Sequence, residues 1–209
     1  MAEKLKRIEV EEKLKDVGAL VFAPSEFAGF FKVPMKRANN FISTNLGRGG
    51  IFLKLRNGLY AVKDAHPSRF FIANKLYDPS YISLNTALSY YGIIPEVVYG
   101  VTSITAKTTR EFQTPKGNFI YQRIKKKAFT GYGLRLIDKD NVLIAEPEKA
   151  LADYLYFVDL KRVSLNDRLN LKKIKRAELI KFVKLFGRPS MLKLVEHIYA
   201  EYKKPRKIY

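Results

Sequence analysis

The chain has 209 residues, of which 47% are hydrophobic and 13% aromatic, enough to pack one large domain or two small ones and too many for a disordered chain. It contains no cysteine, which excludes disulfides and thiolate-based nucleophiles or metal sites. The formal net charge of +19 favours a polyanionic partner, either nucleic acid or an anionic surface.

Targeting and membrane signals are not found in the sequence. The N-terminal residues lack the basic-then-apolar order of a signal peptide, and the longest apolar stretch, residues 18–23, is far too short to cross a bilayer. We therefore expect a cytoplasmic protein that does not enter a membrane.

Residues 3–23 begin with a charged, helical pattern. Its apolar side is marked by Leu5, Ile8, Leu14 and Val17. We expect this helix to lead the N-terminal domain and to pack on the two helices that follow. A coiled-coil arm is the alternative, but the sustained heptads that it requires are absent.

A short helix and a tight turn are predicted next. The helix runs from Ser25, which caps the free amides, to about Phe30, and Glu26 is favourable in its first turn. Val33 precedes a proline, which pushes it out of the helical region, so Lys32 and Val33 make the turn.

The second helix begins at Pro34, which suits a first helical position, and runs to Leu46, with Gly47 as its stop. One side is apolar and is expected to face the domain: Met35, Ala38, Phe41, Ile42 and Leu46. The other side bears charges, amides and hydroxyls: Lys36, Arg37, Asn40, Ser43 and Thr44, with Asn39 at its edge. Because arginine and lysine read guanine, asparagine reads adenine and hydroxyls reach phosphates, this side has the chemistry of a helix in a major groove.

A hairpin follows, because Asn57-Gly58 separates two apolar runs within residues 51–62. Its tip would carry Lys54, Arg56 and Asn57, where phosphates or a minor groove can be met, and Arg48 in the preceding loop is a further phosphate candidate. Helix, turn, helix and hairpin in this order indicate a winged helix-turn-helix, a DNA-binding unit, over residues 1–66. The alternative is an ordinary helical hairpin followed by a structural β-ribbon with a solvated, charged face.

Residues 67–209 are expected to form a second domain of mainly antiparallel sheet plus helices, which makes the protein α+β. Asp64–Pro67 marks the boundary, and Asp78-Pro79 separates two helices, at residues 67–77 and at 84–91, where Ser83 is the cap. The predicted strands cover residues 97–105, 109–113, 119–124, 134–137 and 142–145. Three helices follow, over residues 146–158, 175–186 and 190–202, before a basic tail at residues 203–207.

Catalytic candidates are few. The two histidines lie apart, one in the linker and one in a terminal helix, without metal-ligand spacing. A metal-dependent nuclease would need clustered carboxylates, for which Asp138, Asp140, Glu146 and Glu148 are the candidates, but Lys149 follows Glu148 directly and breaks the required alternation. The glutamates fit a helix N-terminus better. We expect no enzyme activity, no cofactor and no metal.

Basic residues also gather near the C-terminus, where residues 161–209 hold 15 lysines and arginines against 4 acids. One helical region carries six of them: Lys172, Lys173, Lys175, Arg176, Lys181 and Lys184. A solvated helix face, an additional contact with the DNA backbone and a partner surface are all consistent with this cluster. Lys125–Lys127 ends a strand, where it could meet DNA phosphate, RNA or an acidic patch of a toxin, although a solvated strand end fits better.

Three segments in order resemble the AbiEi-type antitoxins of type IV toxin–antitoxin systems: Gly58–Tyr60, Tyr81–Gly92 and Ala145–Asp153. The similarity covers roughly residues 20–160. It implies a regulator whose winged domain binds inverted repeats in double-stranded DNA upstream of its own operon and represses it. It also implies a C-terminal domain that counters a co-encoded nucleotidyltransferase-like toxin without a stable complex.

Only the DNA-facing positions carry over from this resemblance. They are Lys36, Arg37, Asn40, Ser43 and Thr44 on the helix and Lys54, Arg56 and Asn57 in the wing. The matching C-terminal segments are apolar helix faces and imply fold rather than chemistry. A stand-alone transcription factor or chromatin protein without a toxin is the alternative function, and a nuclease is less favoured.

Overall fold

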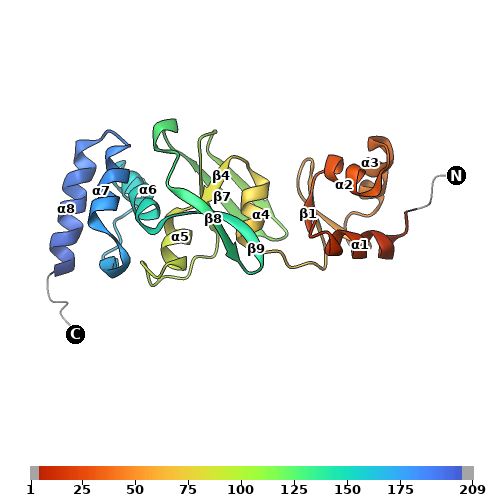
Figure 1. The fold of residues 1–209 in the computed structure, drawn as a ribbon, viewed down its shortest axis with the longest axis horizontal. Helices are drawn as coiled ribbons and strands as arrows, with labels where there is room; N and C mark the ends of the chain where they lie inside the picture. Colours follow the sequence, from red (N-terminus) through yellow and green to blue (C-terminus); the bar gives the residue numbers. More distant parts are fainter. Residues whose placement is uncertain (1–4, 204–209) are drawn as a thin grey trace.

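The computed structural model describes residues 5–203, so the predicted basic tail beyond Lys203 lies outside the described residues. Within that range the chain is an α+β protein with eight α-helices and two sheets. The first three helices and the last two lie at opposite ends of the molecule, with the larger sheet between them (Figure 1). In this part of the chain, no helix combines the length and apolar character needed to cross a membrane.

The N-terminal unit is built from three helices and a small antiparallel sheet of order β1-β3-β2. Its elements are α1 (Arg7–Asp16), β1 (Val21–Phe22), α2 (Pro24–Phe31), α3 (Met35–Thr44), β2 (Phe52–Arg56) and β3 (Leu59–Val62). The Asn57-Gly58 turn joins β2 and β3 as predicted, and Gly58 has a positive φ of 73° that glycine adopts without strain. Strand β1 was not anticipated, because two residues are too few to show a pattern.

The apolar side of α1 differs from the prediction. Val10 and Leu14 are buried in the N-terminal core, whereas Ile8 is 73% and Val17 51% exposed. The helix begins at Arg7 and presents the pair Val10 and Leu14, one turn apart, to the other helices. Of the four residues expected on the apolar side, Leu14 is buried and Leu5 packs on the N-terminal core, so the prediction is confirmed for these two and wrong for Ile8 and Val17.

The C-terminal unit is a six-stranded sheet with helices packed against it and beyond one end. The helices are α4 (Arg69–Leu76), α5 (Leu84–Tyr90), α6 (Pro147–Asp159), α7 (Arg176–Lys184) and α8 (Pro189–Lys203). The strands are β4 (Ser80–Ile82), β5 (Val101–Thr105), β6 (Arg110–Thr114), β7 (Gly117–Arg123), β8 (Tyr132–Ile137) and β9 (Asp140–Ala145). Two 3-10 turns, at Lys126–Ala128 and Leu171–Lys173, complete the described elements.

The sheet order is β6-β7-β5-β4-β9-β8, and three of its five strand pairs are antiparallel, in line with the prediction of a mainly antiparallel sheet. Strand pairs β5–β7 and β4–β9, near its centre, are parallel. Strand β6 folds back on the outer side of β7, which leaves β5 to pair with the inner side of β7 in the same direction. The short strand β4 was missed in the sequence, and with it the parallel pair that joins the two halves of the sheet.

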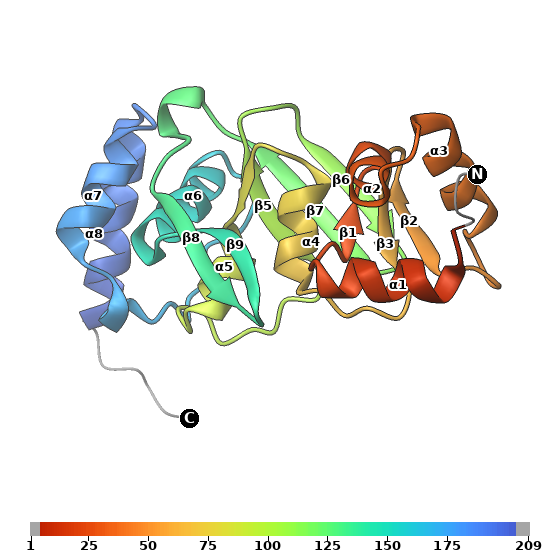
Figure 2. The ribbon, with the colours of Figure 1, turned by 45° about the vertical axis from the view of Figure 1, so that its right-hand side comes forward.

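The small N-terminal sheet is buried on both faces. Phe22, Phe52 and Val62 face the N-terminal helices, whereas Leu55 and Leu59 belong to the core of the C-terminal unit. Strand β2 lies against β6, and Figure 2 shows the hairpin beside the edge of the larger sheet. The two units therefore share packed apolar residues.

Polar bonds reinforce this junction around the connecting segment, residues 63–68. Lys116 Nζ donates to the carbonyl oxygens of Lys63 (3.1 Å) and Ala65 (2.9 Å). The backbone N–H of Ser68 donates to Asp140 Oδ2 (2.6 Å). The connecting segment is thus held by the C-terminal unit along its length.

Candidate nucleic-acid interface

The turn between α2 and α3 is set by local chemistry. Helix α2 begins at Pro24, one residue before the expected start, because proline pre-sets the first helical position. The cap is supplied by Glu26, whose Oε2 accepts from the N–H of Ala23 (2.7 Å), and not by the exposed Ser25. Lys32 takes a left-handed conformation with φ 49°, which ends the helix and turns the chain.

Helix α3 starts one residue later and ends two residues earlier than the sequence suggested. Pro34, with an extended ψ of 149°, precedes the helix as its cap residue instead of being its first member. The helix stops at Thr44 because the side chain of Asn45 donates to the carbonyl of Phe41 (2.8 Å), the group that a further turn would have used. Leu46 and Gly47 lie beyond it.

The inner side of α3 packs on α2. Ala38 and Ile42 are fully buried, and the ring of Phe41 stacks on that of Phe27 with centroids 5.7 Å apart. Met35, the first residue of α3, was expected on this side but is 46% exposed. The buried residues fix which face of α3 points outward.

The outward face of α3 carries the predicted polar side chains. Those that are exposed are Lys36, Asn39, Asn40, Ser43 and Thr44, and Arg37 is partly buried. The hydroxyls of Ser43 and Thr44 both donate to the carbonyl of Asn40 (2.9 Å each). To donate to a phosphate, these hydroxyls would have to give up that internal bond. The longer side chains of Lys36, Arg37 and Asn40 are the ones suited to reach bases.

The hairpin places its basic residues on different sides. Lys54 is exposed and pairs across the strands with Tyr60, which packs on the N-terminal core, so Lys54 lies on the helix side of the sheet. Arg56 was expected to project from a free wing tip, but its Nε donates to the carbonyl of Leu76 in the C-terminal unit (2.8 Å). Its Nη1 donates to the carbonyl of Asn57 (2.8 Å), so the guanidinium ties the tip to the second unit.

The two remaining candidates lie on exposed turns. Arg48 is exposed in the loop between α3 and β2, and its carbonyl accepts from Lys63 Nζ (3.1 Å). Arg7 Nη1 donates to the carbonyl of Gly49 in the same loop (3.2 Å). Asn57 is exposed at the hairpin turn, close to the C-terminal unit.

A buried polar network in the C-terminal unit was not predicted from the sequence. Lys149 and Asp153 form an ion pair one turn apart on α6, and both side chains are fully buried. Asp153 Oδ2 also accepts from Tyr81 (3.0 Å) and from Ser83 (2.8 Å), so Ser83 binds this carboxylate instead of capping α5. Burial raises the pKa of Asp153 even though its three partners favour the charged form, and it raises the pKa of Tyr81 well above its usual value.

This network joins β4 to α6 and leaves its members bonded to one another. Gly131 packs closely against this network. A Cβ at this position would lie 3.0 Å from Lys149 Cγ and 2.4 Å from a ring carbon of Phe182. The signal available in the sequence was the four-residue spacing of a lysine and an aspartate inside an otherwise apolar run. On an exposed helix, the same spacing is an ordinary surface pair.

Three of the four carboxylates considered for a nuclease are engaged with separate partners. Asp140 holds the Ser68 amide, Glu146 pairs with Arg135 (2.8 Å), and Glu148 accepts from the Lys175 amide (2.9 Å). Within residues 5–203, no group of three histidine or acidic side chains is placed to hold a metal ion.

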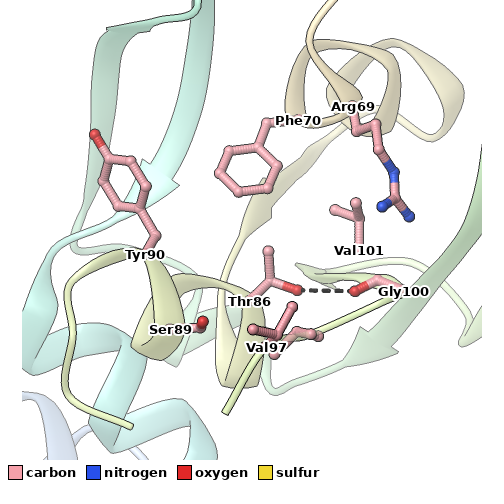
Figure 3. A pocket seen from close by; sticks show the side chains of 9 residues that line it. Arg69, Phe70, Thr86, Ser89, Tyr90, Val97, Gly100 and Val101 are labelled. Atoms are coloured by element: carbon pink, nitrogen blue, oxygen red, sulfur yellow. Dashed lines mark hydrogen bonds between the residues drawn. The ribbon is translucent and has the colours of Figure 1, made fainter. Parts of the chain in front are cut away.

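A small hollow of about 210 Å³ lies on the C-terminal unit between α4, α5 and the start of β5 (Figure 3). The rings of Phe70 and Tyr90 approach at 6.1 Å between centroids, and Thr86 donates to the carbonyl of Gly100 (3.2 Å). The guanidinium of Arg69 is bonded to the carbonyl of Tyr99. The lining is mainly apolar, and the side chains of Arg69, Thr86 and Ser89 already donate to backbone carbonyls.

No protein-family model matches this chain, and no curated protein matches it either.

Proposed function

We propose that the protein is a sequence-specific regulator that binds double-stranded DNA, with residues 5–66 acting as a winged helix-turn-helix and α3 seated in the major groove. The observation that carries the proposal is the two-sided character of α3. Its buried Ala38 and Ile42 orient a face on which the side chains of Lys36, Arg37 and Asn40 lie within about one turn of one another.

The element order supports this proposal. Three helices, a β-hairpin and a first strand that pairs with β3 are the parts that a winged helix-turn-helix requires. In the proposed complex, Lys36, Arg37 and Asn40 meet base edges, while Ser43, Thr44, Arg48 and Lys54 meet phosphates. Arg56 is assigned to the junction between the units, because its guanidinium is already bonded there.

The resemblance to AbiEi-type antitoxins extends the proposal. On that reading the protein is a cytoplasmic antitoxin that represses its own operon at inverted repeats, and its C-terminal unit counters a nucleotidyltransferase-like toxin without a stable complex. The mechanism is binding, not catalysis. A co-encoded toxin gene beside this one separates an antitoxin from a stand-alone regulator.

Alanine substitutions on α3 and on the hairpin test the assignment. Asn40→Ala and Arg37→Ala should each reduce discrimination between specific and shuffled duplexes by about tenfold or more, since a bidentate base contact supplies about 1–3 kcal/mol. Lys54→Ala should weaken binding to both duplexes alike. Lys193→Ala, an exposed charge on distant α8, is the matched control. If all three interface variants lose affinity equally for both duplexes, the assignment of α3 as the recognition helix is contradicted.

A further inference from the structure

A second hollow, of about 620 Å³, lies at the end of the molecule opposite α3. It is formed by the loop after α5, the loop before α7 and the last turns of α8, which contributes Tyr202. The backbone N–H of Asn170 donates to the carbonyl of Ile93 (2.7 Å), and Lys173 Nζ donates to the carbonyl of Tyr91 (3.0 Å). These bonds fix the two loops against each other, so the hollow is a formed feature of the fold.

The lining of this hollow mixes apolar and cationic residues. Ile93 and Ile94 are buried, Tyr202 is partly buried and Pro95 is exposed. Arg168 and Lys172 also line it and are exposed. The hollow therefore combines apolar side chains, an aromatic ring among them, with exposed cations.

Positive charge is concentrated around this hollow. Residues 161–176 hold seven lysines and arginines and a single acid, Asp167. The guanidinium of Arg168 is held by Glu96, which also accepts from Asn166 Nδ2 (2.9 Å). That carboxylate orients Arg168 while Lys172, which makes no side-chain bond to any of residues 5–203, supplies a free cation.

We propose that this hollow binds a nucleotide of a single-stranded nucleic acid, with its base on the Pro95 and Tyr202 surface and its phosphate at Lys172 and Arg168. The volume lies in the range of about 300–1,000 Å³ typical of small-ligand sites. Cationic grooves with aromatic platforms take single strands because unpaired bases can stack on them, whereas the bases of a duplex are already stacked inside it. The site is separate from α3 and adds a second class of nucleic acid to the proposed duplex binding.

The test uses the whole chain and a fluorescent oligouridylate of about twelve nucleotides, within the usual range of single-strand sites. Lys172→Ala and Tyr202→Leu should each raise the dissociation constant about tenfold in an anisotropy titration. Tyr202→Phe, which keeps the ring, should bind like the wild type and so separates stacking from any loss of fold. Lys193→Ala removes the same charge from α8, nine residues or about 13 Å of helix from Tyr202, and should change affinity less than twofold.

Competition and a second set of variants complete the design. Uridine monophosphate should displace the oligomer, while inorganic phosphate and an oligoglutamate peptide should not. Equal losses for Lys172→Ala and Lys193→Ala, or displacement by phosphate or the peptide as effective as by the nucleotide, would overturn the inference. Asn40→Ala should leave single-strand binding intact, and a loss of single-strand binding in that variant would overturn this inference. If Asn40→Ala instead leaves duplex discrimination unchanged, only the proposed role of α3 is overturned.

Discussion

Lys149 and Asp153 bear opposite charges that the fold holds completely out of water. Removing one of them leaves the other buried without a counter-charge. We predict that Lys149→Met lowers the free energy of unfolding by about 3–5 kcal/mol. The double variant Lys149→Met/Asp153→Asn should recover most of the loss, because the amide oxygen still accepts from Tyr81 and Ser83. Urea titration measures both, and a single variant as stable as the double one would contradict the buried-pair explanation.

Buried tyrosines make stability depend on alkaline pH. Burial raises the pKa of Tyr91 to about 12, and its hydroxyl donates to the carbonyl of Ala145 (2.8 Å). Burial also raises the pKa of Tyr121, which donates to the carbonyl of Ala73 (2.6 Å). Below pH 10, both folded and unfolded tyrosines are neutral, so the contribution of these bonds is complete. Above pH 10, the unfolded chain loses its protons first, so stability falls as the pH rises toward 12.

We therefore predict that Tyr91→Phe is less stable than the wild type at neutral pH and that the difference narrows above pH 10. Urea midpoints across the alkaline range provide the measurement, with exposed Tyr99→Phe as the control. If the urea midpoints of the Tyr91 variant and the wild type change in parallel with pH, the ionisation of this hydroxyl is not linked to folding.

Single residues differ in how well the sequence predicts their place. The outward face of α3 follows from a period of 3.6 residues, and Lys36, Asn40 and Ser43 are exposed as that period requires. The position of Arg56 depends on a contact with Leu76, 20 residues away, which no local pattern contains. Buried Lys149 and Asp153 have the spacing of a surface pair, and only their apolar neighbours distinguish them.

The hairpin β2–β3 illustrates the same limit for a whole element. Asn57-Gly58 is sufficient to predict the turn and the pairing, because few other dipeptides adopt that geometry. The surface that the hairpin contacts was not predictable, since each of its faces contributes buried apolar side chains to a core. Short strands β1 and β4 were missed for a related reason: two or three residues carry no periodicity, and their partners lie far along the chain.

We predict that Leu59→Ala, on the hairpin, lowers the free energy of unfolding by about 2–5 kcal/mol, as for other large-to-small core changes. Leu59 is buried among residues of the C-terminal core even though it belongs to the N-terminal sheet. Leu53→Ala, a partly buried position on the same hairpin, should have a smaller effect. If the two variants are equally stable in urea, the hairpin does not form the junction in solution.

The two units together should unfold as one. Leu55 and Leu59 pack in the C-terminal core, and Lys116 and Arg56 bond across the junction, so neither unit can open without exposing apolar surface of the other. We predict a single urea transition, with coincident midpoints for far-UV circular dichroism and tyrosine fluorescence. Two separated midpoints would mean that residues 5–66 fold independently.

Charge is distributed over the molecule with one strongly basic end, around residues 161–176, and a polar helix face at the other. Non-specific attraction of such a chain to any polyanion is expected and is screened by salt. Discrimination between sequences depends on the base contacts proposed for α3 and persists when the electrostatic part is weakened.

The measurement that tests this most directly is a mobility-shift titration on the DNA upstream of the protein's own gene, against a shuffled duplex, at about 50 and 200 mM salt. Base reading by α3 predicts a preference above about a hundredfold that survives the higher salt. With about six phosphate contacts, the logarithm of affinity should fall against that of salt concentration with a slope near −5. Equal and steeply salt-sensitive binding to both duplexes would contradict the proposed function and reduce α3 to a backbone contact.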